Sequence, residues 1–151
     1  MWMGKKGATD EQIDEAFEIS QSKEFVDSKQ GRLDYVIEQG GKNLSGGQKQ
    51  RLTIARALVK KPQILILDDS ASALDFATDA KLRKAIASME GKMTVFIVSQ
   101  RTSSIQHADK IVVLDDGQIV MIGTHEELLE KCEEYREIHY SQISKDEKGG
   151  K

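Results

Sequence analysis

The sequence predicts an α/β domain preceded by a mainly helical segment, and three observations lead to this prediction. Residues 1–61 carry helix-capping signals and apolar residues at helical spacing, whereas residues 62–143 alternate apolar runs with helical patterns. The unbroken apolar run Ile64–Leu67 marks the change between them. We therefore expect a helical part at 1–61, an α/β core with a mainly parallel sheet at 62–143, and a loose, disordered polar tail at 144–151.

Three helices are expected in the first part. Thr9–Gln12 forms a capping box, which opens the first helix, and apolar residues at helical spacing follow it. A short helical stretch is expected around Lys23–Asp27. The third helix begins at Ser45 and must end near Lys60, because Pro62 follows.

The second part should begin with two strands and a helix between them. Ile64–Leu67 and Thr94–Val98 are short apolar runs, which are typical of strands buried on both faces. The sequence between them favours a helix from about Phe76 to Met89.

A hairpin and a C-terminal helix complete the expected core. The apolar runs Ile111–Leu114 and Ile119–Ile122 flank Asp116 and Gly117, a strong hairpin signal. Thr124–Glu127 is a capping box that opens one long helix. The residues of this helix expected to face inward are Leu128, Leu129, Cys132, Tyr135 and Ile138.

The composition fits a globular domain and excludes several classes of protein. Charged residues make up 31% of the 151 residues and the net charge is −3, so nothing suggests a general affinity for nucleic acid. No apolar run approaches the roughly 20 residues of a membrane span, and no secretory signal is visible. The single cysteine, Cys132, is interpreted as a small buried hydrophobe. The three histidines have no metal-ligand spacing, so we interpret them as structural.

The segment Asn43–Gln48 is the sharpest functional signal. Ser45 can cap the helix that starts here, and Gly46 and Gly47 leave the backbone N–H groups uncovered. A helix N-terminus with bare amides and a serine hydroxyl is suited to binding a phosphate. The alternative is a plain serine-capped helix entered through a flexible glycine turn.

Two carboxylates follow at the ends of structural elements. Asp68 ends the apolar strand, a position where an aspartate can hold Mg²⁺ or can simply be an acidic residue at a strand end. Asp75 closes the segment Ser72–Asp75 and leads into a helix, so it could be an ordinary N-cap. The order and spacing of these elements together favour a functional reading.

The order of these motifs resembles that of the nucleotide-binding domains of ABC transporters, of the exporter type. Leu44–Gln48 matches the signature motif, Ile64–Asp69 resembles Walker B, and Ser72–Asp75 resembles the D-loop. Val98–Arg101 occupies the place of the switch loop. The resemblance covers nearly the whole chain apart from the tail, and it implies part of a P-loop NTPase fold.

The resemblance also implies ligands and partners. In the family two such domains pair head to tail, and each signature completes the ATP site on the Walker A loop of the other. It implies an ATPase on the cytoplasmic face of the membrane, joined to a transmembrane domain, with Asp68 holding Mg²⁺ through water. The residues implied to contact ATP are Ser45, Gly46, Gly47, Gln48 and Asp75.

Two positions depart from the family pattern. Asp69 stands where the family has a catalytic glutamate, and its side chain is one methylene shorter, so it should reach the attacking water poorly. Gln100 stands at the switch position, which is normally histidine; glutamine can hydrogen-bond a γ-phosphate but cannot become charged. The pair resembles the degenerate subunit of heterodimeric multidrug exporters, in which the intact signature serves the competent site of the partner.

The segment Val36–Gly40 resembles the short acidic segment that exporters carry before the signature. In the family it contacts the coupling helices of the membrane domain. The alternative is an ordinary surface loop.

No segment of the sequence matches Walker A, G-x-x-x-x-G-K followed by Ser or Thr. The nearest candidate has Gly41 and Lys42, but Val36 stands where the first glycine belongs and Asn43 where Ser or Thr belongs. We therefore expect the chain to begin past Walker A, as a truncation of the domain, and to be inactive alone. Such a chain would leave an apolar strand edge and an apolar face of the sheet open, which favours self-association.

Two other functions remain open at this point. A soluble ABC ATPase that acts on nucleic acid or ribosomes would need coiled-coil heptads or a basic stripe, and neither is visible. A non-catalytic module that binds another nucleotide-binding domain is the second alternative.

Overall fold

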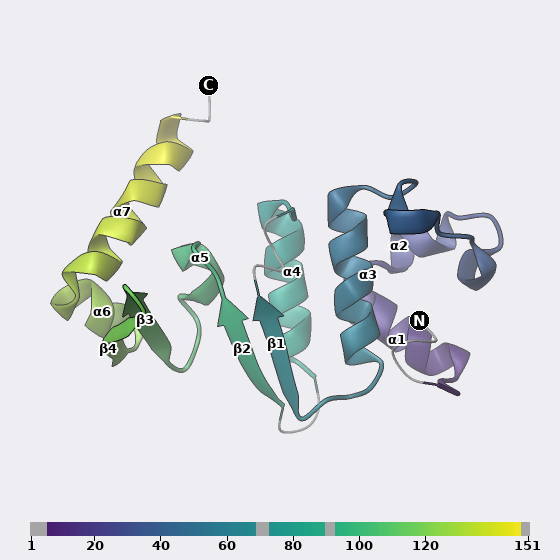
Figure 1. Ribbon diagram of the computed structural model, residues 1–151, viewed down its shortest axis with the longest axis horizontal. Coiled ribbons are helices and arrows are strands. Elements are labelled where there is room, and N and C mark those ends of the chain that lie inside the picture. Colours follow the sequence, from purple (N-terminus) through teal and green to yellow (C-terminus); the bar gives the residue numbers. More distant parts are fainter. Residues whose placement is uncertain (1–5, 69–72, 90–92, 149–151) are drawn as a thin grey trace. The chain divides into compact units, whose positions relative to one another are not determined.

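The computed structural model describes residues 6–68, 73–89 and 93–148 (Figure 1). It divides into two compact units, Met1–Phe96 (unit 1) and Ile97–Lys151 (unit 2). The boundary expected from the sequence, between residues 61 and 62, falls inside unit 1 and stays a prediction about domain organisation.

Unit 1 begins with short helices, and the expected caps are confirmed. Thr9 forms a capping box with Gln12, and Ser45 forms one with Gln48. The third helix ends at Leu58, close to the expected stop, and Lys61 then adopts a positive φ of 48° before Pro62. The elements are α1 (Asp10–Ile19), α2 (Lys23–Asp27), the 3₁₀ helices η1 (Arg32–Asp34) and η2 (Gln39–Gly41), and α3 (Gly46–Leu58).

The strands of the α/β part lie where the sequence predicted them, but their burial differs. The elements are β1 (Ile64–Asp68), α4 (Phe76–Ala87) and β2 (Thr94–Val98). β1 and β2 form a two-stranded sheet, and both arrows point the same way in Figure 1, so the pair is parallel. β1 alternates, with Leu65 and Leu67 buried and Ile64 and Ile66 exposed. No residue of β2 is fully buried. The prediction of strands buried on both faces is therefore wrong for this chain.

The core of unit 1 lies where α1, α3 and α4 meet. α1 contacts both α3 and α4, and each helix buries one apolar stripe. The buried apolar residues are Ile13, Ala16, Phe17, Val26, Ile54, Ala55, Leu58, Val59, Leu65, Leu67, Leu74, Leu82 and Ile86.

Unit 2 is a hairpin with short helices around it. The expected turn is confirmed, because Asp116 and Gly117 both have positive φ (48° and 77°) between two antiparallel strands. The register shifts between Val113 and Leu114. The elements are α5 (Thr102–Ile105), β3 (Ile111–Asp115), β4 (Gln118–Gly123), α6 (His125–Lys131) and α7 (Glu133–Lys148).

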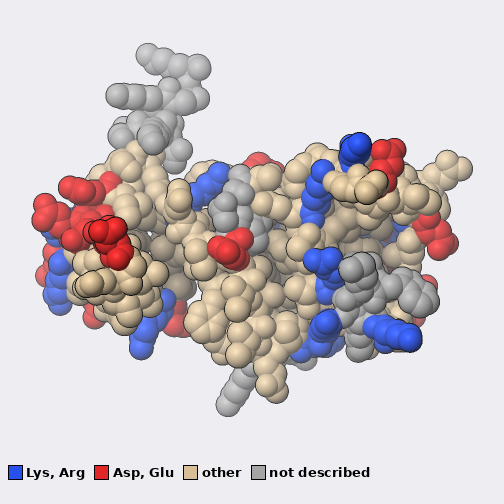
Figure 2. Space-filling view, viewed as in Figure 1, with Lys and Arg blue, Asp and Glu red and all other residues tan. Residues whose placement is uncertain are grey.

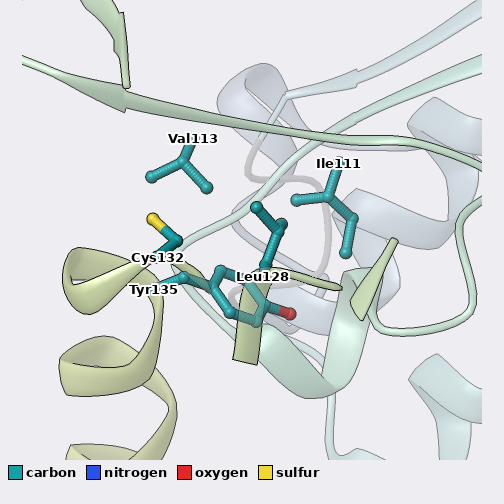
Figure 3. Close-up of a cluster of buried hydrophobic side chains, with 5 residues drawn as sticks. All are labelled: Ile111, Val113, Leu128, Cys132 and Tyr135. Carbon is teal, nitrogen blue, oxygen red and sulfur yellow. The ribbon is translucent and has the colours of Figure 1, made fainter. Parts of the chain in front are cut away.

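One face of the hairpin packs against α6 and α7. Figure 3 shows Ile111 and Val113 of β3 directed toward Leu128, Cys132 and Tyr135, and all five are buried. The burial of Cys132 is as expected, and the structure records its thiol as free.

The C-terminal helix differs from its prediction in three respects. It is not continuous, because Cys132 adopts an extended backbone (φ −113°, ψ 113°) and separates α6 from α7. Ile138, expected to face inward, is 43% exposed. The described part of the expected loose tail, residues 144–148, continues α7 as helix. No helix in the described part of the chain is long and apolar enough to cross a membrane.

Candidate functional site

The N-terminus of α3 is organised around Ser45. Its Oγ accepts the N–H of Gln48 at 3.2 Å, and the Gln48 side chain accepts the N–H of Ser45 at 3.0 Å. The first bond of the helix runs from the N–H of Lys49 to the carbonyl of Ser45. Since the first four amides of a helix have no partner within it, Gly46 and Gly47 present the N–H groups that an anion can reach. No acidic residue occupies the first turn of α3 to oppose an anion.

The second glycine also permits a close approach of the backbone. A Cβ atom on Gly47 would lie 3.0 Å from the carbonyl oxygen of Ala73, so a side chain there would press on backbone. The Ala73 N–H donates to Oε1 of Gln50 at 3.1 Å, one turn further along α3. The start of α3 and the segment before α4 are therefore fastened to each other.

Asp75 caps α4, as one of the two interpretations expected. One carboxylate oxygen accepts the backbone N–H of Thr78 at 2.9 Å and the other accepts its hydroxyl at 2.7 Å. These hydrogen bonds hold the pKa of the Asp75 carboxyl below its ordinary value, with the backbone bond as the larger cause. Both carboxylate oxygens of Asp75 thus accept hydrogen bonds from Thr78. To contact ATP as well, an oxygen would have to accept a second hydrogen bond.

The remaining predicted residues are distributed over the chain. Asp68 is exposed at the carboxyl end of β1. Asp69 and Ser72 lie outside the described residues, so their predicted roles have no structural counterpart here. Gln100 belongs to unit 2, where it is exposed just after β2. Unit 1 therefore brings together Ser45–Gln48 and the segment ending at Asp75.

An exposed carboxylate such as that of Asp68 is a donor that suits Mg²⁺, which prefers oxygen ligands. Over the described residues, however, no group of three or more His, Cys, Asp or Glu side chains could hold an ion. The described residues therefore form no complete metal-binding cage around Asp68.

The segment before α3 is held by Asn43. Its side-chain Nδ2 donates to the hydroxyl of Tyr35 and to the carbonyl of Val36, both at 3.0 Å, and its Oδ1 accepts the N–H of Glu38 at 3.1 Å. Val36 and Ile37 are exposed, Val36 to 77%. The loop therefore presents two apolar side chains from a fastened backbone.

A cavity of about 520 Å³ lies in unit 1 beside this loop. Its wall combines apolar side chains with basic ones and with the carboxylates of Asp10 and Asp34. The apolar and basic side chains include Phe17, Phe25, Lys29, Arg32, Ile37 and Arg56.

Sequence reasoning missed contacts of three residues in these arrangements. The bond between Gln50 and Ala73 joins residues 23 positions apart, which no local pattern reveals. Asn43 lies in the predicted segment Asn43–Gln48, but the sequence did not predict its hydrogen bonds to Tyr35, Val36 and Glu38. Gln142, on α7, donates from Nε2 to the carbonyl of Gln100 at 2.6 Å, and nothing in the spacing of the two residues signals that contact.

The chain is similar to known ABC transporter proteins over most of its length. The family model described as ABC transporter matches residues 5–72. The ABC transporter ATP-binding protein YfiB of Bacillus subtilis is 43% identical over 95% of this chain and 25% of its own length. The ATP-dependent lipid A-core flippase of Vibrio vulnificus is 40% identical over 88% of this chain and 23% of its own length.

A solved structure of a bacterial Atm1-family ABC exporter with ATP bound matches 93% of this chain and 25% of that chain, at 33% identity and a TM-score of 0.89. The chain spans about a quarter of the length of these relatives. The motif order, the structure and the relatives agree, and the chain belongs to the ATP-binding domain family of ABC transporters, of which it covers a part.

Proposed function

We propose that this chain supplies the signature helix to an ATP site completed by a second ABC nucleotide-binding domain, within an exporter. The observation that carries the proposal is the N-terminus of α3, where the amides of Gly46 and Gly47 are available and no acidic residue stands in the first turn. Such amides stabilise the negative charge of a bound triphosphate and the charge that develops on it in the transition state. The bond between Gln50 and Ala73 supports a rigid presentation of this end.

The chain's own motifs would serve a second and weaker site. Asp68 is the ligand that would hold Mg²⁺ through water, Asp69 the short general base, and Gln100 the uncharged sensor of the γ-phosphate. Mg²⁺ supplies charge neutralisation at the phosphates when it is bound. The pairing of a weakened site with an intact signature supports a heterodimer, with ATP hydrolysis at the other site.

Two features of unit 1 support docking to a transmembrane domain at the cytoplasmic face of the membrane. Val36 and Ile37 are exposed on a loop that Asn43 fastens to the entry of α3. The neighbouring cavity adds apolar walls with both basic and acidic side chains, and its Arg32 is already paired with Asp14 and Asp27. A partner segment with apolar side chains would complement both.

The test compares two substitutions of Gly46 that differ only in charge. The chain is mixed with a second ABC nucleotide-binding domain that retains its phosphate-binding loop, and ATP-dependent association is measured by analytical ultracentrifugation with Mg-ATP, with ADP and without nucleotide. Gly46→Glu places a carboxylate at the anion site, whereas Gly46→Gln adds nearly the same volume without charge. We expect Gly46→Glu to weaken ATP-dependent association at least roughly tenfold more than Gly46→Gln, on the order of one close charge repulsion.

The outcomes separate the proposal from its alternatives. Equal association of both variants with ATP would overturn the anion-binding role of α3. Association that needs no nucleotide would support the non-catalytic interaction module instead. Calorimetry of the chain alone with millimolar Mg-ATP should show neither binding nor hydrolysis, since no described segment forms a phosphate-binding loop.

A further inference from the structure

The side chain of Gln142 bridges the backbone on both sides of Arg101. Its Nε2 donates to the carbonyl of Gln100 at 2.6 Å, and its Oε1 accepts the N–H of Thr102 at 3.0 Å. All of these residues belong to unit 2. A single carboxamide on α7 thereby uses both its donor and its acceptor on the segment that follows β2.

Further contacts hold the same segment. Ser99 Oγ accepts the N–H of Arg101 at 3.0 Å. The hydroxyl of Thr102, a residue only 4% exposed, lies 3.3 Å from Oε1 of Gln142 and 3.0 Å from Nδ1 of His139. His139 and Gln142 are three residues apart on α7, so they lie on the same face of that helix.

We propose that Gln142 is a positioning residue that sets the backbone from which the Gln100 side chain projects. The proposal rests on the proposed function, in which Gln100 senses a γ-phosphate. Gln142 fixes both the carbonyl of Gln100 and the N–H of Thr102. This restricts the backbone dihedral angles between these two groups, and so restricts the direction of the Gln100 side chain. α7 then belongs to the sensing apparatus through its contact with the backbone of the segment after β2.

Two substitutions separate the donor from the acceptor. Gln142→Glu keeps the size and the acceptor for Thr102, but when ionised it has no donor and sets a carboxylate oxygen against the Gln100 carbonyl. Gln142→Ala removes both bonds. Gln118→Glu, at the exposed start of β4, makes the same charge change away from the network and is the matched control.

The measurement is ¹⁵N NMR of the full 151-residue chain with amide hydrogen exchange. We expect Gln142→Ala to speed exchange of the Thr102 amide by roughly tenfold, the value of one net hydrogen bond. Gln142→Glu should keep that protection within about twofold, by the same reasoning, yet shift the backbone and side-chain amide signals of Gln100. Circular dichroism shows whether a variant keeps its helices, and Gln142→Glu decides the matter if Gln142→Ala does not fold.

A pH series gives a signature that mere packing would not produce. The carboxyl group introduced by Gln142→Glu gains an O–H when it is protonated, and this O–H can donate to the Gln100 carbonyl. The Gln100 signals of this variant should therefore return toward wild type as the pH falls through about 4–5. His139 lies beside His125 and Tyr135, and these titratable groups are present in every variant. Each spectrum is therefore compared with the wild-type spectrum at the same pH, so that their effects cancel.

Wild-type signals for residues 99–102 in Gln142→Glu, or the same small shifts as in Gln118→Glu, would overturn the positioning role. None of these measurements uses nucleotide. Failure of the ATP-dependent association described above would thus overturn the proposed function and leave the positioning of Gln100 standing.

Discussion

The carbonyl oxygen of Ala73 lies 3.0 Å from the position that a Cβ atom on Gly47 would occupy. The same residue donates its N–H to Gln50 on the next turn of α3. Gly47 therefore has a packing role in this chain, in addition to the anion-binding role that we propose for its amide. It lets the start of α3 lie against the segment that leads to Asp75.

Gly47→Ala should destabilise the chain by about 1–3 kcal/mol, because the added methyl group meets backbone that must shift. Gly46→Ala is the matched control, since its Cβ would lie 3.4 Å from the Ala73 methyl group and alanine favours a helix by up to about 1 kcal/mol over glycine. Urea unfolding followed by circular dichroism measures both. Equal stability of the two variants would show that Ala73 moves away without cost.

The cap at Asp75 should make stability depend on pH. The pKa of its carboxyl is lowered by the Thr78 hydrogen bonds, so folding favours the ionised form. This contribution is complete above the ordinary aspartate pKa of about 3.9 and is lost as the pH falls through the lower folded value. Asp75→Asn keeps a good cap but does not titrate. Its unfolding midpoint should match wild type at pH 7 and fall less between pH 5 and 3; an identical acid loss in both proteins would contradict the assignment.

Local signals predicted the elements of this fold well. The capping boxes at Thr9, Ser45 and Thr124 act within three residues, and each lies where the sequence placed it. The turn at Asp116 and Gly117 is equally local. Burial was predicted less well, because it depends on what covers a strand. The apolar run at β1 favoured a strand buried on both faces, whereas Ile64 and Ile66 are exposed, which agrees with the separate expectation of an open apolar face.

The candidate site shows the same difference between local features, which the sequence predicted, and long-range contacts, which it did not. Ser45 as a cap and Asp75 as a possible cap follow from residue type and helix position. The contacts of Gln50 with Ala73 and of Gln142 with Gln100 join residues 23 and 42 positions apart, and no periodicity predicts such pairs. The break of the C-terminal helix at Cys132 was also missed, since the apolar spacing of α6 continues across it.

The pKa of His139 should depend on the neighbouring ring of His125. The ring centroids of His125 and His139 lie 5.2 Å apart. The pKa of His139 is lowered, first by partial burial and then by the positive charge of His125. The folded state therefore binds a proton at His139 less readily than the unfolded chain does. The free energy of unfolding is unaffected above about pH 6.5, declines as the pH falls below that value, and levels off below the folded pKa.

Replacing His125 should remove the second cause of the lowered His139 pKa, the positive charge of His125. In His125→Asn the pKa of His139 should rise part of the way toward its ordinary value, because burial still opposes the charge. His107→Asn, on an exposed histidine, is the control and should leave it unchanged. An NMR titration of the His139 ring measures both. The coupling is refuted by a His139 pKa that is the same in wild type and His125→Asn.

The exposed face of the sheet should make the chain self-associate. Ile64, Ile66 and Phe96 are each at least 55% exposed, and Figure 2 shows a mostly uncharged surface where Figure 1 places β1 and β2. Contiguous apolar surface of this kind favours contact between copies. Ile66→Lys should weaken self-association roughly tenfold or more, because burying one isoleucine side chain contributes about 1.5–3 kcal/mol. Val36→Lys, which makes the same change on an exposed loop, should have little effect. Light scattering over a concentration series decides: a monomer at every concentration, or equal weakening by both variants, would show that this face does not mediate the contact.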